Sequence, residues 1–183
     1  MKMLPAKKFY FIRHGETDFN RRNQFQGHTD TLINARGREQ AMRQSPKVKA
    51  LNINKVFSSP LSRALETAQI LTGHCEIDIL DDLKECGCPE TAAEIFEDLG
   101  LPSPDFSQAS ITYNETKHEF MTRSVNAVST ALTTTEGTPL IVAHGGTYWA
   151  LCRFLGHPPN RIPNCTPILF EANSQGWQIG RLS

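Results

Sequence analysis

Two histidines and two arginines of this sequence stand beside glycine or serine in three short segments: RHGET at 13–17, SSPLSR at 58–63 and AHGG at 143–146. The guanidinium groups of Arg13 and Arg63 match phosphate oxygens in a bidentate way. A nearby cation disfavours protonation of an imidazole, so His14 or His144 would stay neutral and able to attack phosphorus. The three segments together predict an oxyanion pocket that contains a nucleophilic imidazole.

Each of the three segments follows a predicted buried strand, and this placement would bring them together. The strands are expected at Phe9–Ile12, Lys55–Ser58 and Leu140–Ala143. In an open α/β sheet, ligands bind outside the carboxyl ends of the strands. Two of the segments also lead into predicted helices, whose free N-terminal N–H groups favour anions.

The rest of the chain alternates apolar runs with helical patterns, which favours an α/β fold. A third strand is expected at Cys75–Leu80. A closing strand pair is expected at Asn164–Phe170 and Gly176–Leu182, which brings the total to about six strands. A length of 183 residues predicts a single domain spanning 1–183.

Helix boundaries are predicted from capping residues, glycines and prolines. A helix that begins at Asn34 should stop or restart at Pro46, with Ser45 able to act as a new N-cap. The SSP segment at 58–60 should cap and start a helix that ends at Gly73. Further helices are expected over Thr91–Leu99, between the capping residue Asn114 and Gly137, and after His144.

Composition argues against several classes of protein. The 19 Lys and Arg residues balance 19 Asp and Glu residues, so the basic excess of a dedicated nucleic-acid binder is missing. No apolar run approaches the length that spans a bilayer, and the basic N-terminus precedes too short an apolar stretch for a signal peptide. We therefore expect a cytoplasmic protein with no nucleic-acid or membrane partner.

The 5 cysteines are odd in number and scattered, a pattern typical of reduced thiols rather than of a disulfide framework. Cys86 and Cys88 form the one close pair, but no Cys/His cluster with metal-ligand spacing lies near them in the sequence. No metal site is predicted, and the role of the pair stays open.

Further blocks stand in order along the chain. They are RHGET with Asn20; Gln26-Gly27, Asp30, Leu32, Asn34, Gly37 and Gln40-Ala41; SSPLSRA with Thr67-Ala68; Leu83 with Glu85; Glu115 with Phe120 and Arg123; and VAHGG at 142–146. In this order they resemble the motifs of the histidine phosphatase superfamily, also called phosphoglycerate mutase-like proteins. The resemblance covers nearly the whole chain and implies a three-layer α/β/α sandwich with a mostly parallel central sheet.

The resemblance also implies roles for the candidate residues. His14 would take the phosphoryl group, and Glu85 would donate a proton to the leaving oxygen. The phosphate oxygens would be held by Arg13, Arg63 and His144, with Asn20 near the phosphate or the substrate. The candidate substrate contacts are Gln26, Gly27 and Gly145. No metal ion and no cofactor are implied.

Two assignments stay open at this point. Glu85 is favoured as the acid, and the carboxyl groups of Glu90, Asp82 and Glu16 are alternatives. His28 follows the Gln26-Gly27 block, so it is a further candidate for contact with the substrate.

The expected activity is hydrolysis of a phosphomonoester through a phosphohistidine, with a small phosphorylated metabolite as substrate. The segment 86–116 should cover the pocket, and it contains several carboxylates but no Lys, Arg or His. Like-charge repulsion should then disfavour the second anionic group that a phosphoglycerate mutase must hold. A mutase, a protein phosphohistidine phosphatase and a non-catalytic phosphate-binding module are the alternatives, and the chain could be a monomer or a homodimer.

Overall fold

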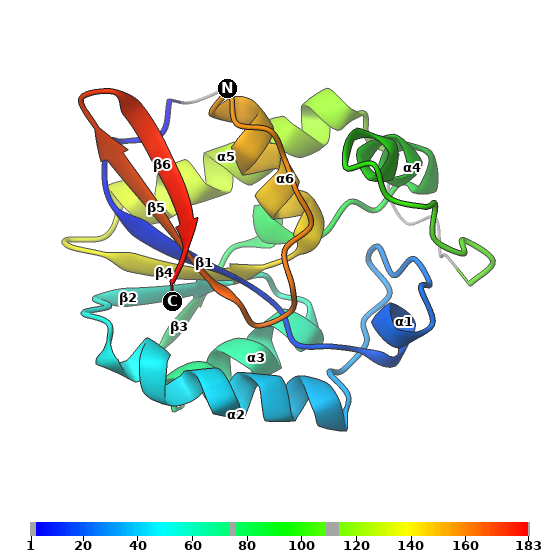
Figure 1. The fold of residues 1–183 in the computed structure, drawn as a ribbon, viewed down its shortest axis with the longest axis horizontal. Coiled ribbons are helices and arrows are strands. Elements are labelled where there is room, and N and C mark those ends of the chain that lie inside the picture. The colour runs from blue at the N-terminus through cyan, green and yellow to red at the C-terminus, as the bar shows by residue number, and fades with distance from the viewer. Residues whose placement is uncertain (1–2, 74–75, 109–113, 183) are drawn as a thin grey trace.

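A computed structural model describes residues 3–73, 76–108 and 114–182 of the chain. Its centre is a 6-stranded sheet in the order β3-β2-β4-β1-β5-β6 (Figure 1). The strands are β1 (Phe9–Arg13), β2 (Lys55–Ser58), β3 (Ile77–Ile79), β4 (Pro139–Ala143), β5 (Pro167–Asn173) and β6 (Gly176–Arg181). The first four are mutually parallel, and β5 and β6 run antiparallel at one edge. The predicted mostly parallel sheet of about six strands is confirmed.

Helices cover both faces of the sheet. They are α1 (Asp18–Arg21), α2 (Ala35–Ala50), α3 (Ser62–Thr72), the 3-10 helix η1 (Asp81–Leu83), α4 (Pro89–Asp98), α5 (Lys117–Thr133) and α6 (Gly145–Phe154). In Figure 1, α2 and α3 lie below the sheet, α5 and α6 lie above it, and α1 and α4 lie beyond one end. The three-layer α/β/α arrangement predicted from the sequence is therefore present.

Alternation along the strands divides the hydrophobic core into two layers. Phe9 and Phe11 of β1 pack in one cluster, which includes residues of α5 and α6. Tyr10 and Ile12 pack in a second cluster, with residues of α2 and α3. Successive side chains of a strand point to opposite faces, so a strand buried on both faces reads as a continuous apolar run.

Most predicted strands and helix ends match the structure. Gly73 ends α3 with a left-handed φ of 78°, and Gly100 follows α4 with a φ of 62°. The closing pair is the antiparallel hairpin of β5 and β6. The third strand is shorter than expected, and Cys75, at the start of the predicted segment, lies outside the described residues.

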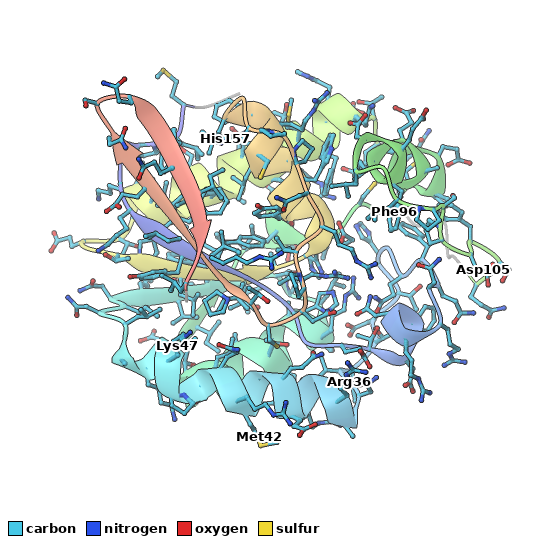
Figure 2. All side chains as sticks on the ribbon, viewed as in Figure 1. Arg36, Met42, Lys47, Phe96, Asp105 and His157 are labelled. Carbon is cyan, nitrogen blue, oxygen red and sulfur yellow. The ribbon has the colours of Figure 1, made fainter. Side chains whose placement is uncertain are left out.

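The prediction that a helix stops or restarts at Pro46 is wrong. α2 begins after Asn34, whose side chain caps the Gly37 N–H, and continues through Pro46 without a break. Proline removes the helical donor to the carbonyl of residue 42. Met42 is exposed and points away from the sheet in Figure 2, so water can reach this side of the helix. Ser45 is no N-cap, because its hydroxyl donates to the carbonyl of Leu71.

Two predicted helix starts are also wrong. α3 begins at Ser62 rather than at Pro60, and its first turn is capped from a distant segment: Asp30 accepts hydrogen bonds from the Ser62 N–H and hydroxyl, each at 2.7 Å. α5 is capped by Thr116 rather than by Asn114, in a reciprocal capping box with Glu119.

Candidate active site

The carboxyl ends of β1, β2 and β4 meet at one edge of the sheet, as the sequence predicts. The His14 N–H donates to the Ala143 carbonyl at 3.0 Å, and the Ser59 N–H donates to the Val142 carbonyl at 3.1 Å. These bonds continue the parallel ladder past the strand ends. They place the ring of His14 and the ring of His144 with their centroids 5.3 Å apart.

His14 is buried and held in one orientation. Its Nδ1 lies 2.7 Å from the Gly15 carbonyl, so Nδ1 carries the proton and donates. The Nε2 atom then keeps its lone pair. Burial lowers the pKa of His14 well below 6.5, and the positive charges of Arg63 and Arg13 lower it further. The imidazole is therefore neutral, which is the form that can act as a nucleophile.

The turn after His14 depends on two glycines and a threonine. The Gly15 N–H donates to the Thr67 hydroxyl at 2.9 Å, and that hydroxyl donates to the Arg63 carbonyl at 2.6 Å. A Cβ on Gly15 would lie 2.8 Å from the Gly37 carbonyl oxygen, so any side chain there would push α2 away. The RHG segment is thus fixed against α2 and α3 together.

Arg63 has no exposed surface, and two of its N–H donors are bonded to backbone carbonyls of the protein. Its Nη1 donates to the Thr29 carbonyl at 2.9 Å, and its Nη2 donates to the Gly27 carbonyl at 2.8 Å. The Nε N–H is buried without a partner. Burial lowers the pKa of Arg63 to about 10, so the group stays cationic at neutral pH.

Arg13 is held in a similar way to Arg63, by a backbone carbonyl at Nη1 and with no partner at Nε. Its Nη1 donates to the Ile162 carbonyl at 3.0 Å, and its Nε is buried without a partner. Burial lowers its pKa to about 10 as well. Buried donors normally have partners, so two unpaired guanidinium N–H groups beside one imidazole indicate a site for an acceptor that the protein itself does not supply.

His144 lies behind this cavity rather than in its wall. It is fully buried, and its Nε2 lies 2.8 Å from the Ser59 hydroxyl, while its Nδ1 has no partner. Burial lowers the pKa of His144 well below 6.5, and the positive charge of Arg63 lowers it further. We call Arg13, His14 and Arg63, with His144 behind them, the phosphate floor, after the role that the resemblance implies. The structure places the predicted nucleophile His14 and the predicted phosphate-binding residues Arg13, Arg63 and Asn20 in the lining of one cavity, whereas His144 does not line it.

Glu85 lies in the wall of the same cavity. One carboxylate oxygen accepts from the Cys86 N–H at 3.0 Å, and the other accepts from the Gly146 N–H at 3.2 Å. The three alternative carboxyl groups, those of Glu90, Asp82 and Glu16, do not line the cavity. Among the predicted candidates, Glu85 is the carboxyl group that the structure places beside the phosphate floor.

Both helix N-termini predicted to attract anions hold a carboxylate of the protein. Gly146, in the first turn of α6, donates to Glu85, and Ser62, at the start of α3, donates to Asp30. The anion preference of a helix N-terminus is therefore used to position side chains here.

An ion pair behind Glu85 fixes the segment that carries it. Arg123 donates to both carboxylate oxygens of Glu115, at 2.8 and 2.7 Å, and Glu115 is buried. The same guanidinium donates to the backbone carbonyls of Asp82, Lys84 and Glu85. The resemblance included Glu115 and Arg123 but assigned them no role. Their spacing across the start of α5 was the signal in the sequence.

The predicted substrate contacts line the cavity, but several of their polar atoms are already bonded. Gln26 accepts from the hydroxyls of Thr17 and Thr31, and the Gly27 carbonyl accepts from Arg63. Asn20 accepts from the Thr17 N–H and so completes the capping box in which Thr17 is the N-cap of α1. These residues therefore shape the wall whatever else they bind. Gly145 lies near Arg13 and also lines the cavity.

Two further side chains bear on the site. The Asn164 side chain donates to the His14 carbonyl at 2.7 Å, an anchor that sequence reasoning missed because no motif marks this proline-rich loop. His28, the additional candidate contact, does not line the cavity. Its Nε2 lies 2.8 Å from the Glu85 carbonyl oxygen, so it packs behind the acid segment.

The cover of the cavity differs from the acidic surface that was expected. The side of α4 that faces the cavity is apolar, and the carboxylates lie elsewhere: Glu94 and Asp98 pair with Lys117, and Glu115 pairs with Arg123. The side chains that line this part are Phe25, Ala92, Ile95, Phe96, Leu99, Leu101 and Pro104. We call these residues the apolar wall. Figure 2 shows Phe96 on the part of α4 nearest the α1 region.

Two absences hold for residues 3–73, 76–108 and 114–182 of the chain. There, no group of three or more His, Cys, Asp or Glu side chains is arranged to hold a metal ion. No helix in the same ranges is long and apolar enough to cross a membrane. The four described cysteines are free thiols and buried.

This chain is similar to known proteins in both sequence and fold. The model of the histidine phosphatase superfamily (branch 1) matches residues 9–183. The chain belongs to the histidine phosphatase superfamily. A probable phosphoglycerate mutase GpmB from Escherichia fergusonii is 31% identical over 185 residues, which cover 92% of this chain and 86% of the relative.

Solved structures share the fold at lower identity. A phosphoserine phosphatase variant from Entamoeba histolytica, in complex with phosphoserine, matches with a TM-score of 0.75 and 21% identity over 97% of both chains. A mycobacterial glucosyl-3-phosphoglycerate phosphatase in complex with VO3 matches with a TM-score of 0.75 and 21% identity, over 96% of this chain and 98% of that one. Proteins named as mutases and as phosphatases thus resemble this chain, so family membership alone does not separate the two activities.

Proposed function

We propose that this protein is a metal-independent phosphatase that hydrolyses phosphomonoesters through a phosphohistidine on His14. The observation that carries the proposal is the neutral His14 imidazole flanked by two buried guanidinium groups, each with an unpaired Nε N–H. A phosphate group placed there would supply the missing acceptors. The two cations would neutralise its charge, which is the role that a metal ion has in other phosphoryl-transfer enzymes.

The first chemical step forms a bond between His14 and phosphorus. The lone pair of Nε2 attacks phosphorus while the bond from phosphorus to the ester oxygen breaks, and the leaving oxygen takes that electron pair. Glu85, entering the step as the protonated acid, gives its proton to this oxygen, so the product is a neutral alcohol.

The second step returns the enzyme to its starting state. Glu85, now a carboxylate, accepts a proton from a water molecule whose oxygen attacks phosphorus. The bond between phosphorus and Nε2 breaks, and its electron pair returns to His14. Inorganic phosphate leaves, and Glu85 is again protonated. The Arg13 and Arg63 N–H groups hold the phosphoryl oxygens through both steps.

The apolar wall supports hydrolysis over mutase chemistry. A mutase must hold a second anionic group and retain a phosphorylated product. The described part of the 86–116 cover carries no cation, and its inner face is apolar. The name of the relative from Escherichia fergusonii favours the mutase instead, which makes this the second candidate function. Small monophosphates are the proposed substrates, and the cytoplasm is the proposed location.

A direct comparison of the rates of phosphate release and of mutase turnover distinguishes the two candidate functions. Release of inorganic phosphate from a panel of monophosphates is measured beside a coupled mutase assay with 3-phosphoglycerate and its bisphosphate cofactor. We expect phosphate release that does not need the cofactor and is lost in His14→Ala. Mutase turnover equal to or above the best hydrolysis rate would overturn the proposal.

A further inference from the structure

We infer that the apolar wall binds the leaving group, so that the preferred substrates are phosphate monoesters of uncharged aromatic or aliphatic alcohols. This inference rests on the proposed phosphatase function and names its substrate class. It concerns the part of the cavity that does not touch the phosphate.

The wall offers apolar surface that the folded protein leaves partly uncovered. Phe96, Leu99 and Leu101 are only half-buried although all three line the cavity. Ala92 and Ile95 continue the same surface from the inner side of α4. Such surface gains stability only when an apolar group covers it, at roughly 25 cal/mol for each Å² removed from water.

Reaction geometry places the leaving group against this wall. In phosphoryl transfer the attacking atom and the leaving oxygen lie roughly in line on opposite sides of phosphorus. The leaving oxygen must therefore be on the side of Glu85, away from His14. Cys86, next to Glu85, packs in one apolar cluster with Phe25 and with Ala92 and Ile95 of α4. A substituent on the leaving oxygen would contact these side chains first.

The wall is tied across the cavity by backbone hydrogen bonds. The Phe25 N–H donates to the Asp105 carbonyl, and the Asp105 N–H donates to the Asn23 carbonyl, both at 2.9 Å. The rings of Phe25 and Phe106 lie with their centroids 5.1 Å apart. Asp105 itself points to Ser107 and Gln24 and does not line the cavity. The wall is therefore a built surface that presents apolar groups.

Cations near the cavity serve the phosphate end rather than the wall. Among the described residues that line the cavity, Arg161 is the cation besides Arg13 and Arg63. It lies near enough to Arg13 for its charge to lower the pKa of that residue. A carboxylate or second phosphate on a leaving group that lies against Phe96 and Leu99 would lose hydration without gaining a cationic partner from these side chains.

A series of straight-chain alkyl monophosphates, from ethyl to hexyl phosphate, tests the inference on the full-length wild-type protein. Their leaving groups are similar alkoxides, so differences in kcat/KM report contact with the chain rather than chemistry. We expect kcat/KM to rise by up to about fourfold for each added methylene that is buried. Phosphoserine and 3-phosphoglycerate should fall below hexyl phosphate.

Two variants of α4 assign the effect to the wall. Phe96→Ser should lower kcat/KM for hexyl phosphate by about tenfold and flatten the series. Leu99→Arg should raise the ratio of the rate with 3-phosphoglycerate to the rate with hexyl phosphate, because it supplies the missing cation. Glu97→Gln is the control, since Glu97 is exposed, neighbours Phe96 in sequence and does not line the cavity. Its series should keep the wild-type slope.

The outcomes separate the two claims. A flat series, or a higher kcat/KM for 3-phosphoglycerate than for hexyl phosphate, would overturn the substrate class and leave the phosphatase intact. A slope that survives in both Phe96→Ser and Leu99→Arg would also overturn it. Failure to release phosphate from every ester, including 4-nitrophenyl phosphate, would overturn the proposed function itself.

Discussion

The phosphate floor and the apolar wall contribute to one cavity, but different interactions hold them in place. On the floor, Arg63 donates to the backbone carbonyls of Thr29 and Gly27, and His14 donates to the carbonyl of Gly15. On the wall, Phe96 and Leu99 are half-buried apolar side chains of one short helix. On the floor, hydrogen bonds fix the orientation of each polar group. On the wall, the side chains determine only the shape and the polarity of the cavity surface.

This difference separates two kinds of recognition. The floor would bind the group that all phosphomonoesters share, so its residues should matter equally for every substrate. The wall would bind the part that differs, so its residues should matter in proportion to the apolar surface of the leaving group.

The largest effect is expected from Arg63→Lys. A lysine ammonium carries its three donors on one nitrogen, so it cannot reproduce the two carbonyl bonds from separate Nη atoms together with the Nε N–H of the planar fork. We expect kcat/KM to fall by about 10²–10³-fold for every ester, a loss typical for an oriented donor to a developing charge. The comparison is with Arg43→Lys on the exposed side of α2, where the side chain is 74% exposed and no loss is expected. A loss confined to long-chain esters would contradict the division between floor and wall.

Gly146→Ala should have the next largest effect, and it should depend on the leaving group. A Cβ there would collide with the Glu85 carboxylate and lie 2.9 Å from the Phe120 ring. Displacing the acid should cost about 10²-fold with alkyl esters and less with aryl esters, whose phenolates leave without a proton. Gly145→Ala should lose less, since its Cβ would meet only the Arg13 guanidinium, at the ordinary distance of 3.7 Å. Equal losses in the two variants would show that Glu85 is not the group displaced.

A smaller effect is expected from breaking the Glu115–Arg123 pair. Glu115→Gln leaves Arg123 without its bidentate partner, so the segment that carries Glu85 should loosen. We expect kcat with alkyl esters to fall about tenfold while KM changes little, and unfolding free energy to fall by about 3 kcal/mol. A purely structural role would lower stability without changing the ratio of alkyl to aryl rates. Kinetics on both esters beside urea unfolding distinguish the two cases.

The smallest effect is a pH dependence that the floor alone should produce. Burial lowers the pKa of His14 and His144 well below 6.5, so the folded protein binds fewer protons than the unfolded chain in mild acid. Stability should therefore be complete above about pH 6.5 and fall below it, by roughly 1.4 kcal/mol for each histidine one pH unit lower. The acidic limb of kcat/KM should likewise lie below pH 6.5. A limb above that value would mean that His14 is charged in the free enzyme.

The sequence predicts the floor better than the wall, for a physical reason. His14, Arg63 and His144 follow strands or begin helices, and parallel topology brings such positions together. Asn164 anchors His14 from a loop 150 positions away, which no local pattern marks. Asp30 likewise caps α3 from outside that helix.

The acidic cover was the main misinterpretation, although the sequence held the correct signal. Ala92, Ile95, Phe96 and Leu99 recur at the spacing of one helix face. The number of carboxylates in 86–116 does not reveal which face of α4 carries them, and the face that lines the cavity is apolar. At Pro46 the local signal itself was misleading. Packing of α2 against the sheet overrode the tendency of this proline to break the helix.

The covalent state of His14 during turnover shows directly whether the reaction passes through a phosphohistidine. Wild-type protein is mixed with a labelled monophosphate, quenched in base within milliseconds, digested and mapped. We expect phosphate on Nε2 of His14, stable in base and lost in acid, at a level that approaches one per chain when hydrolysis of the intermediate is slow. Turnover without any phosphate on His14, or phosphate on another residue that survives in His14→Ala, would contradict it.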